Sequence, residues 1–238
     1  MIKKIPAFIG FIAILLIGYL FLQIIPPLLY QNDNDITQTT DCPQYIIDFV
    51  AKNPQASELK DNYTTKQNNE PIELASPDGI PLYIQWDSRW AFNKYGDEII
   101  GTAGCGPTCL AMVSVGLTGN IEYNPRYIAN YAQNNNYLEG SKTSWSLMQE
   151  GCRDFGLKAT PVTLNKAAMI NELNQGHPII CSVRPGDFTD TGHFIVITKF
   201  KDNNFIVNDP NSRENSQRQW SYERLSWQIK AMWSYSLL

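Results

Sequence analysis

The most hydrophobic stretch of the chain lies close to its amino terminus. Residues 5–25 are uncharged and mostly apolar, with Gln23 as the single amide, and Lys3 and Lys4 come directly before them. About 20 such residues span the hydrocarbon core of a bilayer, and basic residues stay on the cytosolic side. The pattern predicts a cytosolic tail at 1–4, a single transmembrane signal-anchor at 5–25, and the rest of the chain outside the cell membrane.

A cleaved secretory signal peptide is the alternative interpretation of this stretch. Such a peptide has a shorter apolar core and small residues at its cleavage site, whereas Pro-Pro-Leu-Leu-Tyr follows here at residues 26–30. We therefore expect the anchor to be retained, and the protein to be secreted only if it is cleaved. Residues 26–41 contain the polar stretch that follows and are expected to form a tether.

Residues 42–79 have a short amphipathic pattern and are expected to form a helical preface to the main domain. Apolar positions at 42–50 fit a helix, the pattern breaks near Asn53, and it resumes from 55 to about 63. This predicts two short helices. Helices of this length are marginal alone, so we expect them to dock on the main domain.

The main domain, residues 80–238, has helical periodicity first and strand-like runs second. We expect helices starting at Cys105 and at 125–133, 144–155 and 166–173, and strands at 82–85, 178–183, 193–198, 205–208 and 232–236. Lys201-Asp202-Asn203-Asn204 fits the turn of a hairpin. Helices followed by antiparallel strands are typical of an α+β domain.

The start of the first of these helices contains the residue of greatest chemical interest, Cys105. Glycines at Gly101, Gly104 and Gly106 allow a sharply turning loop, and Pro107 fits a first helical turn. Cys105 is then expected at the positive end of a mostly buried helix, where the macrodipole and unpaired N–H groups favour a thiolate. This is the environment of a nucleophile. The alternative is a small apolar residue that fills a helix start.

Composition excludes several classes of protein. The net charge of −4 over 238 residues lacks the basic excess of a nucleic-acid binder, so we expect no nucleic-acid partner. The five cysteines are an odd number, and their spacing fits neither a disulfide framework nor a zinc site. We therefore expect at least one free thiol, no metal site and no organic cofactor.

The candidate partners of Cys105 are His193 and Asp209. A nucleophilic cysteine needs a base within hydrogen-bond distance and a third group that orients that base. His193 opens an apolar strand beside a loop, where sites are usually built, whereas His177 lies in a helix-to-strand turn and is expected to be structural. Asp209 ends the next strand, at the same end of the hairpin; alternatively, it is a turn residue before Pro210. The sequence does not fix the strand register, so whether both side chains share a face stays open.

Motifs that recur in order along this domain resemble those of a known family. They are Ile84-Gln85-Trp86-Asp87, Gly104-Cys105-Gly106-Pro107-Thr108, Thr191-Gly192-His193-Phe194-Ile195-Val196 and Val207-Asn208-Asp209-Pro210. Together they resemble the free-standing relatives of the double-glycine peptidases, which are papain-fold cysteine peptidases best known as the leader-removing domains of bacteriocin exporters and common on Gram-positive cell surfaces. The resemblance runs from about Leu82 to the carboxyl terminus. It implies a papain-like α+β fold with the cysteine on a helical half and the histidine and aspartate on an antiparallel sheet.

The resemblance also implies roles for these residues in hydrolysis of a peptide bond. Cys105 would be the nucleophile and His193 the general base and acid, with Asp209 orienting the imidazole. Gln85 would donate its side-chain amide to the oxyanion hole, beside the N–H of Cys105.

This sequence departs from the exporter pattern in two respects. In the exporter domains the glutamine precedes the cysteine by only a few residues, whereas residues 86–104 intervene here, so Gln149 or an asparagine stays a rival to Gln85 as oxyanion donor. No transporter spans or nucleotide-binding segment accompany the domain, so cleavage coupled to export is not expected.

The loop before His193 is expected to select the substrate, which would be a peptide or protein, including a cell-wall or secreted peptide. Asp187 and Asp190 in this loop are candidate substrate-binding residues for a basic or amine-bearing group, although acidic loops are often only solvated. A transglutaminase-like acyl transferase, a cell-wall peptide amidase and a catalytically silent surface binding module stay as alternatives. The full set of glutamine, cysteine, histidine and aspartate argues against the silent module.

Overall fold

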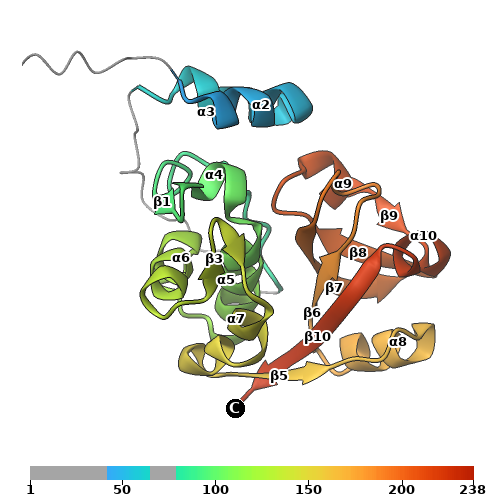
Figure 1. Cartoon of the computed structure of the whole chain (residues 1–238). Helices are drawn as coiled ribbons and strands as arrows, with labels where there is room; N and C mark the ends of the chain where they lie inside the picture. Colours follow the sequence, from blue (N-terminus) through green and yellow to red (C-terminus); the bar gives the residue numbers. More distant parts are fainter. Residues whose placement is uncertain (1–41, 65–78) are drawn as a thin grey trace, which may run out of the picture. The chain divides into compact units, whose positions relative to one another are not determined.

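An antiparallel sheet of six strands is the centre of the computed structural model, which describes residues 42–64 and 79–238 (Figure 1). Its order is β5 (Leu157–Pro161), β10 (Ile229–Leu237), β6 (Ile179–Val183), β7 (His193–Lys201), β8 (Asn204–Asn208) and β9 (Gln219–Trp220). The predicted anchor at 5–25 and the tether at 26–41 lie outside the described residues. Within the ranges described, no helix is long and apolar enough to cross a bilayer.

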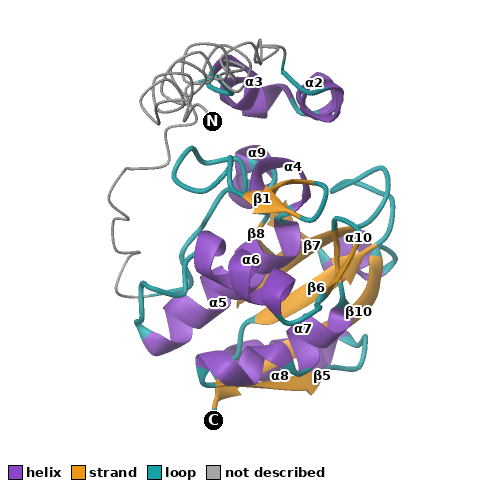
Figure 2. Ribbon diagram, turned by 60° about the vertical axis from the view of Figure 1, so that its left-hand side comes forward, coloured by secondary structure: helices purple, strands orange, loops and turns teal. Residues whose placement is uncertain are grey.

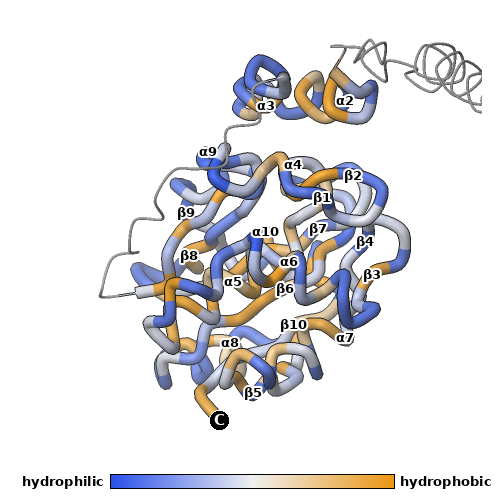
Figure 3. The backbone as a smooth tube through the Cα atoms, turned by 90° about the vertical axis from the view of Figure 1, so that its left-hand side faces the viewer, coloured by the Kyte–Doolittle hydropathy of each residue, from blue (hydrophilic) through white to orange (hydrophobic). Residues whose placement is uncertain are grey.

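Both faces of the sheet are buried, because its central strands alternate between two hydrophobic cores. In β7, Phe194 and Val196 face one core, and Ile195 and Ile197 face the other. This is the two-residue period of a strand covered on both sides. Coloured by the hydropathy of each residue, the chain is hydrophobic in the interior around β6 and mostly hydrophilic in the outer loops (Figure 3).

Helices cover each face of the sheet. One core is formed with α5 (Cys105–Thr118), α6 (Pro125–Asn134), α7 (Trp145–Gln149) and the 3₁₀ helix η3 (Gly151–Phe155). The other is formed with α8 (Lys166–Asn174) and α10 (Tyr222–Ser226), while α9 (Arg213–Gln217) follows β8 and exposes all its residues at least partly. Figures 1 and 2 show α5 to α7 on one side of the strands. The α+β class predicted from the sequence is confirmed.

Two small hairpins lie next to the start of α5. They are β1 (Lys94–Tyr95) with β2 (Glu98–Ile99), and β3 (Leu138–Glu139) with β4 (Lys142–Thr143). Their tips touch: the N–H of Asp97 donates to Oγ of Ser141, and a Cβ on Gly96 would lie 2.4 Å from the carbonyl oxygen of Gly140. Since Gly96 also has a φ of +62°, only glycine fits there without strain.

Residues 42–64, the described part of the expected preface at 42–79, form short helices that pack on the domain. They are α2 (Gln44–Lys52), the 3₁₀ helix η2 (Pro54–Ala56) and α3 (Ser57–Asp61). Ile46 and Leu59 of these helices are buried in a third core against Trp86 and Phe92. The described residues from 42 onward therefore form one compact unit.

The helices around Cys105 and at 144–155 agree with the sequence predictions only in part. Helix α5 is capped by Gly119, whose φ of 72° is left-handed, and this is the stop predicted from the sequence. The glycine-rich stretch before Cys105 is not a loop, because Ile100–Ala103 forms the short helix α4. The predicted helix at 144–155 is split into α7 and η3.

The strand expected at 82–85 is absent, and other contacts hold this segment in place of a ladder. The side-chain amide of Asn208 donates to the carbonyl of Pro81 at 2.9 Å, and the N–H of Gln85 donates to the carbonyl of Pro210 at 2.7 Å. The segment has the apolar pattern of a strand, but it is held by the Asn208 side chain and the Pro210 carbonyl instead of by a neighbouring strand. This is why the strand prediction was wrong.

Candidate active site

Cys105 is the first residue of α5 and lines a pocket of about 1240 Å³. The first turn of this helix packs closely against the hairpin of β3 and β4. A Cβ on Gly106 would lie only 2.4 Å from Oγ1 of Thr143. This close approach needs glycine. The thiol of Cys105 is half-buried, whereas Cys109, one turn later, is fully buried.

The backbone N–H of Cys105 makes no hydrogen bond with any residue that the structure describes. A continuous helix would pair it with the carbonyl four residues earlier, at Gly101. That carbonyl instead accepts the side-chain amide of Gln85, with an Nε2–O distance of 3.1 Å. The N–H of Cys105 is therefore a donor available at the positive end of α5, beside the thiol.

Gln85 is itself buried, with 2% of its surface exposed, and it lines the same pocket as Cys105. Because Gly101 accepts from Nε2, one N–H of this amide is left for a ligand. Its Oε1 is buried and has no hydrogen-bond partner among the described residues. The rival donor Gln149 is exposed and does not line the pocket.

His193 and Asp209 meet in the interior at the end of the β7–β8 hairpin. Nε2 of His193 lies 2.8 Å from Oδ1 of Asp209, and the two residues are 7% and 0% exposed. The register explains the meeting, because Val196 pairs with Asn208. His193 and Asp209 are each an odd number of residues from that pair, so they lie on the same face of the sheet.

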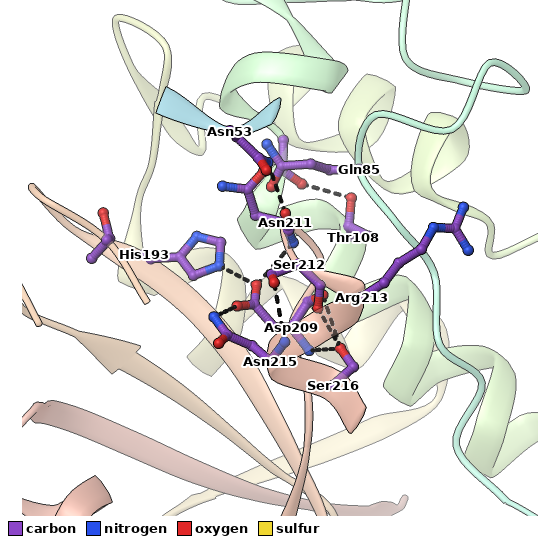
Figure 4. A network of polar contacts seen from close by, with 12 residues as sticks. Asn53, Gln85, Thr108, His193, Asp209, Asn211, Ser212, Arg213, Asn215 and Ser216 are labelled. Carbon is purple, nitrogen blue, oxygen red and sulfur yellow. Dashed lines mark hydrogen bonds and ion pairs between the residues drawn. The ribbon is translucent and has the colours of Figure 1, made fainter. Parts of the chain in front are cut away.

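The carboxylate of Asp209 is held by donors on both oxygens (Figure 4). Besides His193, Oδ1 accepts the N–H of Asn211 at 2.8 Å, and Oδ2 accepts the amide of Asn215 at 2.9 Å. The N–H of Asp209 donates to Oγ of Ser216 at 2.9 Å. These donors on both oxygens fix the orientation of the buried carboxylate.

The imidazole of His193 is set between two groups that favour its proton. Burial lowers its pKa, but the charge of Asp209, the charge of Cys105 and hydrogen bonds to both raise it, to about 10. Since Nε2 binds Asp209, Nδ1 is the nitrogen left for Cys105. His177, the other histidine, bonds instead to Glu172 through Nδ1 at 2.9 Å.

The two acids predicted to bind substrate differ in their surroundings, although both line the pocket. Asp187 accepts from the guanidinium of Arg224, and from the amide of Gln228 at 2.8 Å, and only 15% of its side chain is exposed. Asp190 is exposed. Of the two, Asp190 has the accessible carboxylate, whereas Asp187 links its loop to Arg224 of α10 and to Gln228.

Several residues of the pocket were not predicted from the sequence. Asp48 of helix α2 and Asn53, which caps that helix, line it from the preface, and Trp145, which is 41% exposed, lies at the start of α7. No local pattern links residues this distant in the chain. Among the described residues, no group of three or more histidines, cysteines, aspartates and glutamates is placed to hold a metal ion.

Comparison with known proteins identifies a family for most of the described chain. The family described as Peptidase_C39 like family matches residues 77–236. The fold is similar to the peptidase domain of Streptococcus ComA, a bi-functional ABC transporter involved in a quorum sensing pathway, at 19% identity and a TM-score of 0.44 over 58% of this chain and 93% of that one. It is also similar to a Bacillus anthracis protein described as a C39-like peptidase, at 13% identity and a TM-score of 0.45 over 71% and 99%. No curated protein matches the chain. Because the family match spans more than half of its residues, the chain belongs to the Peptidase_C39 like family.

Proposed function

We propose that this chain is a cysteine peptidase in which Cys105, His193 and Asp209 form a catalytic triad. The observation that supports this most strongly is the buried pair of His193 and Asp209, 2.8 Å apart, whose imidazole lines the same pocket as the Cys105 thiol. A nucleophile, a base and an orienting group in this order are the parts that acyl transfer needs.

The proposed reaction proceeds through a thioester. The Cys105 thiolate attacks the carbonyl carbon of the scissile peptide, and the carbonyl oxygen takes the negative charge. As the C–N bond breaks, the His193 imidazolium gives its proton to the leaving amine. A water molecule then attacks the thioester, with His193 taking its proton, and a carboxylic acid and free Cys105 result.

The oxyanion would be stabilised by the N–H of Cys105 and the remaining N–H of Gln85. Both are supplied by groups that are positioned before substrate binds, because Gly101 holds Gln85 on one side and Pro210 holds its backbone on the other. Each such donor contributes roughly 3 kcal/mol, or about a hundredfold in rate.

A peptide with a basic or amine-bearing group is the proposed substrate. Carboxylates on the pocket lining come from separate elements: Asp48 on α2, Asp97 and Glu98 on the β1–β2 hairpin, Glu139 on β3 and Asp190 before β7. They outnumber the lysines there, which are Lys52, Lys142 and Lys230. We assign the direct contact to Asp190 because Asp187 is already paired.

We also propose that residues 5–25 anchor the enzyme in the cell membrane, with the catalytic domain outside and the amino terminus in the cytosol. This rests on the apolar run and on Lys3 and Lys4 before it. Protease added to intact cells should release the domain if it is external. Protection of the domain until the cells are lysed would reverse the assignment.

The test of the function is cleavage of a peptide library by the full chain and by Cys105→Ala. We expect new free carboxylates with the unchanged chain and none with the variant. Amine-linked adducts in place of carboxylates would show transfer instead of hydrolysis. No reaction, together with iodoacetamide labelling of Cys105 no faster than that of Cys42, would leave only a binding module.

A further inference from the structure

The junction between α2 and η2 is bonded to the loop that follows Asp209. The side-chain amide of Asn53 donates to both the carbonyl oxygen and Oδ1 of Asn211, each at 2.8 Å. The two residues are 158 positions apart in the chain. Figure 4 shows Asn53 reaching this loop from the preface. One amide thus satisfies two acceptors on a single residue of the loop.

Asn211 connects this contact directly to the catalytic pair. Its N–H donates to Oδ1 of Asp209 at 2.8 Å, and the same oxygen accepts Nε2 of His193. The indole of Trp86 also donates to the carbonyl of Asn211, at 3.3 Å. Asn53 is therefore separated from the imidazole by one residue of loop and one carboxylate.

A second residue of the preface holds the next part of the same loop. Oε1 of Gln55 accepts the N–H groups of Arg213 and Glu214, at 3.1 and 3.4 Å, and its Nε2 donates to Oγ of Ser212 at 3.1 Å. These N–H groups belong to the exposed first turn of α9, which leaves its donors unpaired within the helix. Two residues of the preface, Asn53 and Gln55, therefore hydrogen-bond to the segment from Asp209 to α9.

Local structure does not account for the side chain of Asn53. An asparagine between two helices commonly caps the second one, but Asn53 makes no side-chain cap bond to η2. The amide nitrogen donates to both acceptors of Asn211 instead. The Asn53-Pro54 pair that ends α2 therefore has a tertiary role besides stopping the helix.

We propose that Asn53 is a positioning residue of the active site, which fixes Asn211 and through it the carboxylate that orients His193. The preface is then part of the working enzyme. The proposal rests on the triad proposed above. The contrary possibility is that α2, which also lines the pocket, restrains access to it.

The test compares full-length Asn53→Ala and Asn53→Asp with Gln44→Ala. Asn53→Asp keeps the size of the side chain but presents oxygen to the two acceptors of Asn211. Gln44 lies in α2, the helix that Asn53 caps, and is exposed; among the described residues its side chain bonds only to Asp48 of the same helix, so its variant is the control. Because small displacements of catalytic groups lower rates by up to about a hundredfold, we expect kcat to fall about tenfold in Asn53→Ala, at least as far in Asn53→Asp, and KM to change less than about twofold.

Alkylation of Cys105 by iodoacetamide gives a readout that needs no substrate. Asp209 and Cys105 are the groups that raise the pKa of His193. If Asp209 is displaced, this pKa should fall. The basic limb of the pH profile of alkylation should then move to lower pH in both Asn53 variants and not in Gln44→Ala. The double variant Asn53→Ala/Asn211→Ala should lose less than the product of the two single losses, because the pair is in contact.

Several results would overturn the proposal. One is an unchanged kcat and alkylation profile in both Asn53 variants; another is a rise in kcat/KM, which would make α2 a restraint on the pocket. A fall in activity matched by loss of folded protein, with no shift in the profile of the folded fraction, would show a structural role only. If the unchanged chain cleaves no peptide, the proposed function fails, while the alkylation profile still decides the role of Asn53.

Discussion

Replacement of Gln85 by methionine tests how the oxyanion hole is built. Methionine has nearly the same volume as glutamine, so the buried site stays filled. The variant removes the Nε2 donor and, with it, the partner of the Gly101 carbonyl. That carbonyl lies four residues before Cys105, so the N–H of Cys105 can then bond it as in a continuous helix.

The size of the effect follows from the number of donors lost. Loss of the Gln85 amide alone should lower kcat/KM by about a hundredfold, equivalent to roughly 3 kcal/mol. If the N–H of Cys105 then turns to Gly101, the second donor is lost too, and the fall approaches about ten-thousandfold. The free energy of unfolding should change by less than about 1 kcal/mol, because the variant removes one buried hydrogen bond and also the unpaired Oε1.

Two assays run in parallel separate this role from others. Peptide hydrolysis passes through an oxyanion, whereas alkylation of Cys105 by iodoacetamide does not. We expect hydrolysis to fall as stated and alkylation to stay within about threefold, with Gln149→Met, at the exposed rival position, unchanged in both. A parallel loss of both rates would show that Gln85 supports the thiolate or the fold. A fall in hydrolysis below about tenfold would remove Gln85 as a donor.

Further predictions concern pH, packing and specificity. Burial lowers the pKa of His193, but Asp209 and Cys105 raise it from 6.5 to about 10, so the folded state keeps a proton that the unfolded state has lost. The free energy of unfolding of the unchanged chain should therefore fall as pH rises from 6.5 towards 10, measured by urea denaturation; the same slope in His193→Gln would contradict this. Gly106→Ala should destabilise the domain by about 1–3 kcal/mol, because its Cβ would lie 2.4 Å from Oγ1 of Thr143; an unchanged Tm would refute the close contact. Asp190→Asn should lower kcat/KM about two- to fivefold for basic peptides and not for acidic ones, and an equal effect on both would exclude charge selection.

The sequence by itself determined the elements whose signals are local. Apolar periodicity, Pro107 and Gly119 are enough to place α5 and its cysteine. Runs of apolar and β-branched residues locate β6, β7 and β8. The β7–β8 turn follows from Asp202 and Asn203, which take the positive φ values of 51° and 61° that a two-residue hairpin turn needs. These features depend on neighbours within a few residues, so no tertiary information is required.

Short elements were beyond the same reasoning. Strands β1 to β4 and β9 have two residues each, too few to produce a period, and they exist because neighbouring segments pair with them. The expected strand at 82–85 fails for the converse reason. Its pattern is strand-like, but Asn208 and Pro210 occupy its polar groups.

Only the tertiary structure decided how the site is arranged. The β7–β8 register places His193 and Asp209 on one face. Gln85 bonds to Gly101 through one N–H and keeps the other N–H for a ligand. Asp187 bonds to Gln228, and its carboxylate is therefore not accessible to a ligand. The contact of Asn53 with Asn211 joins segments 158 positions apart. The sequence gives the type of each side chain, but which of its hydrogen-bonding groups are paired and which stay available is decided only when distant segments pack together.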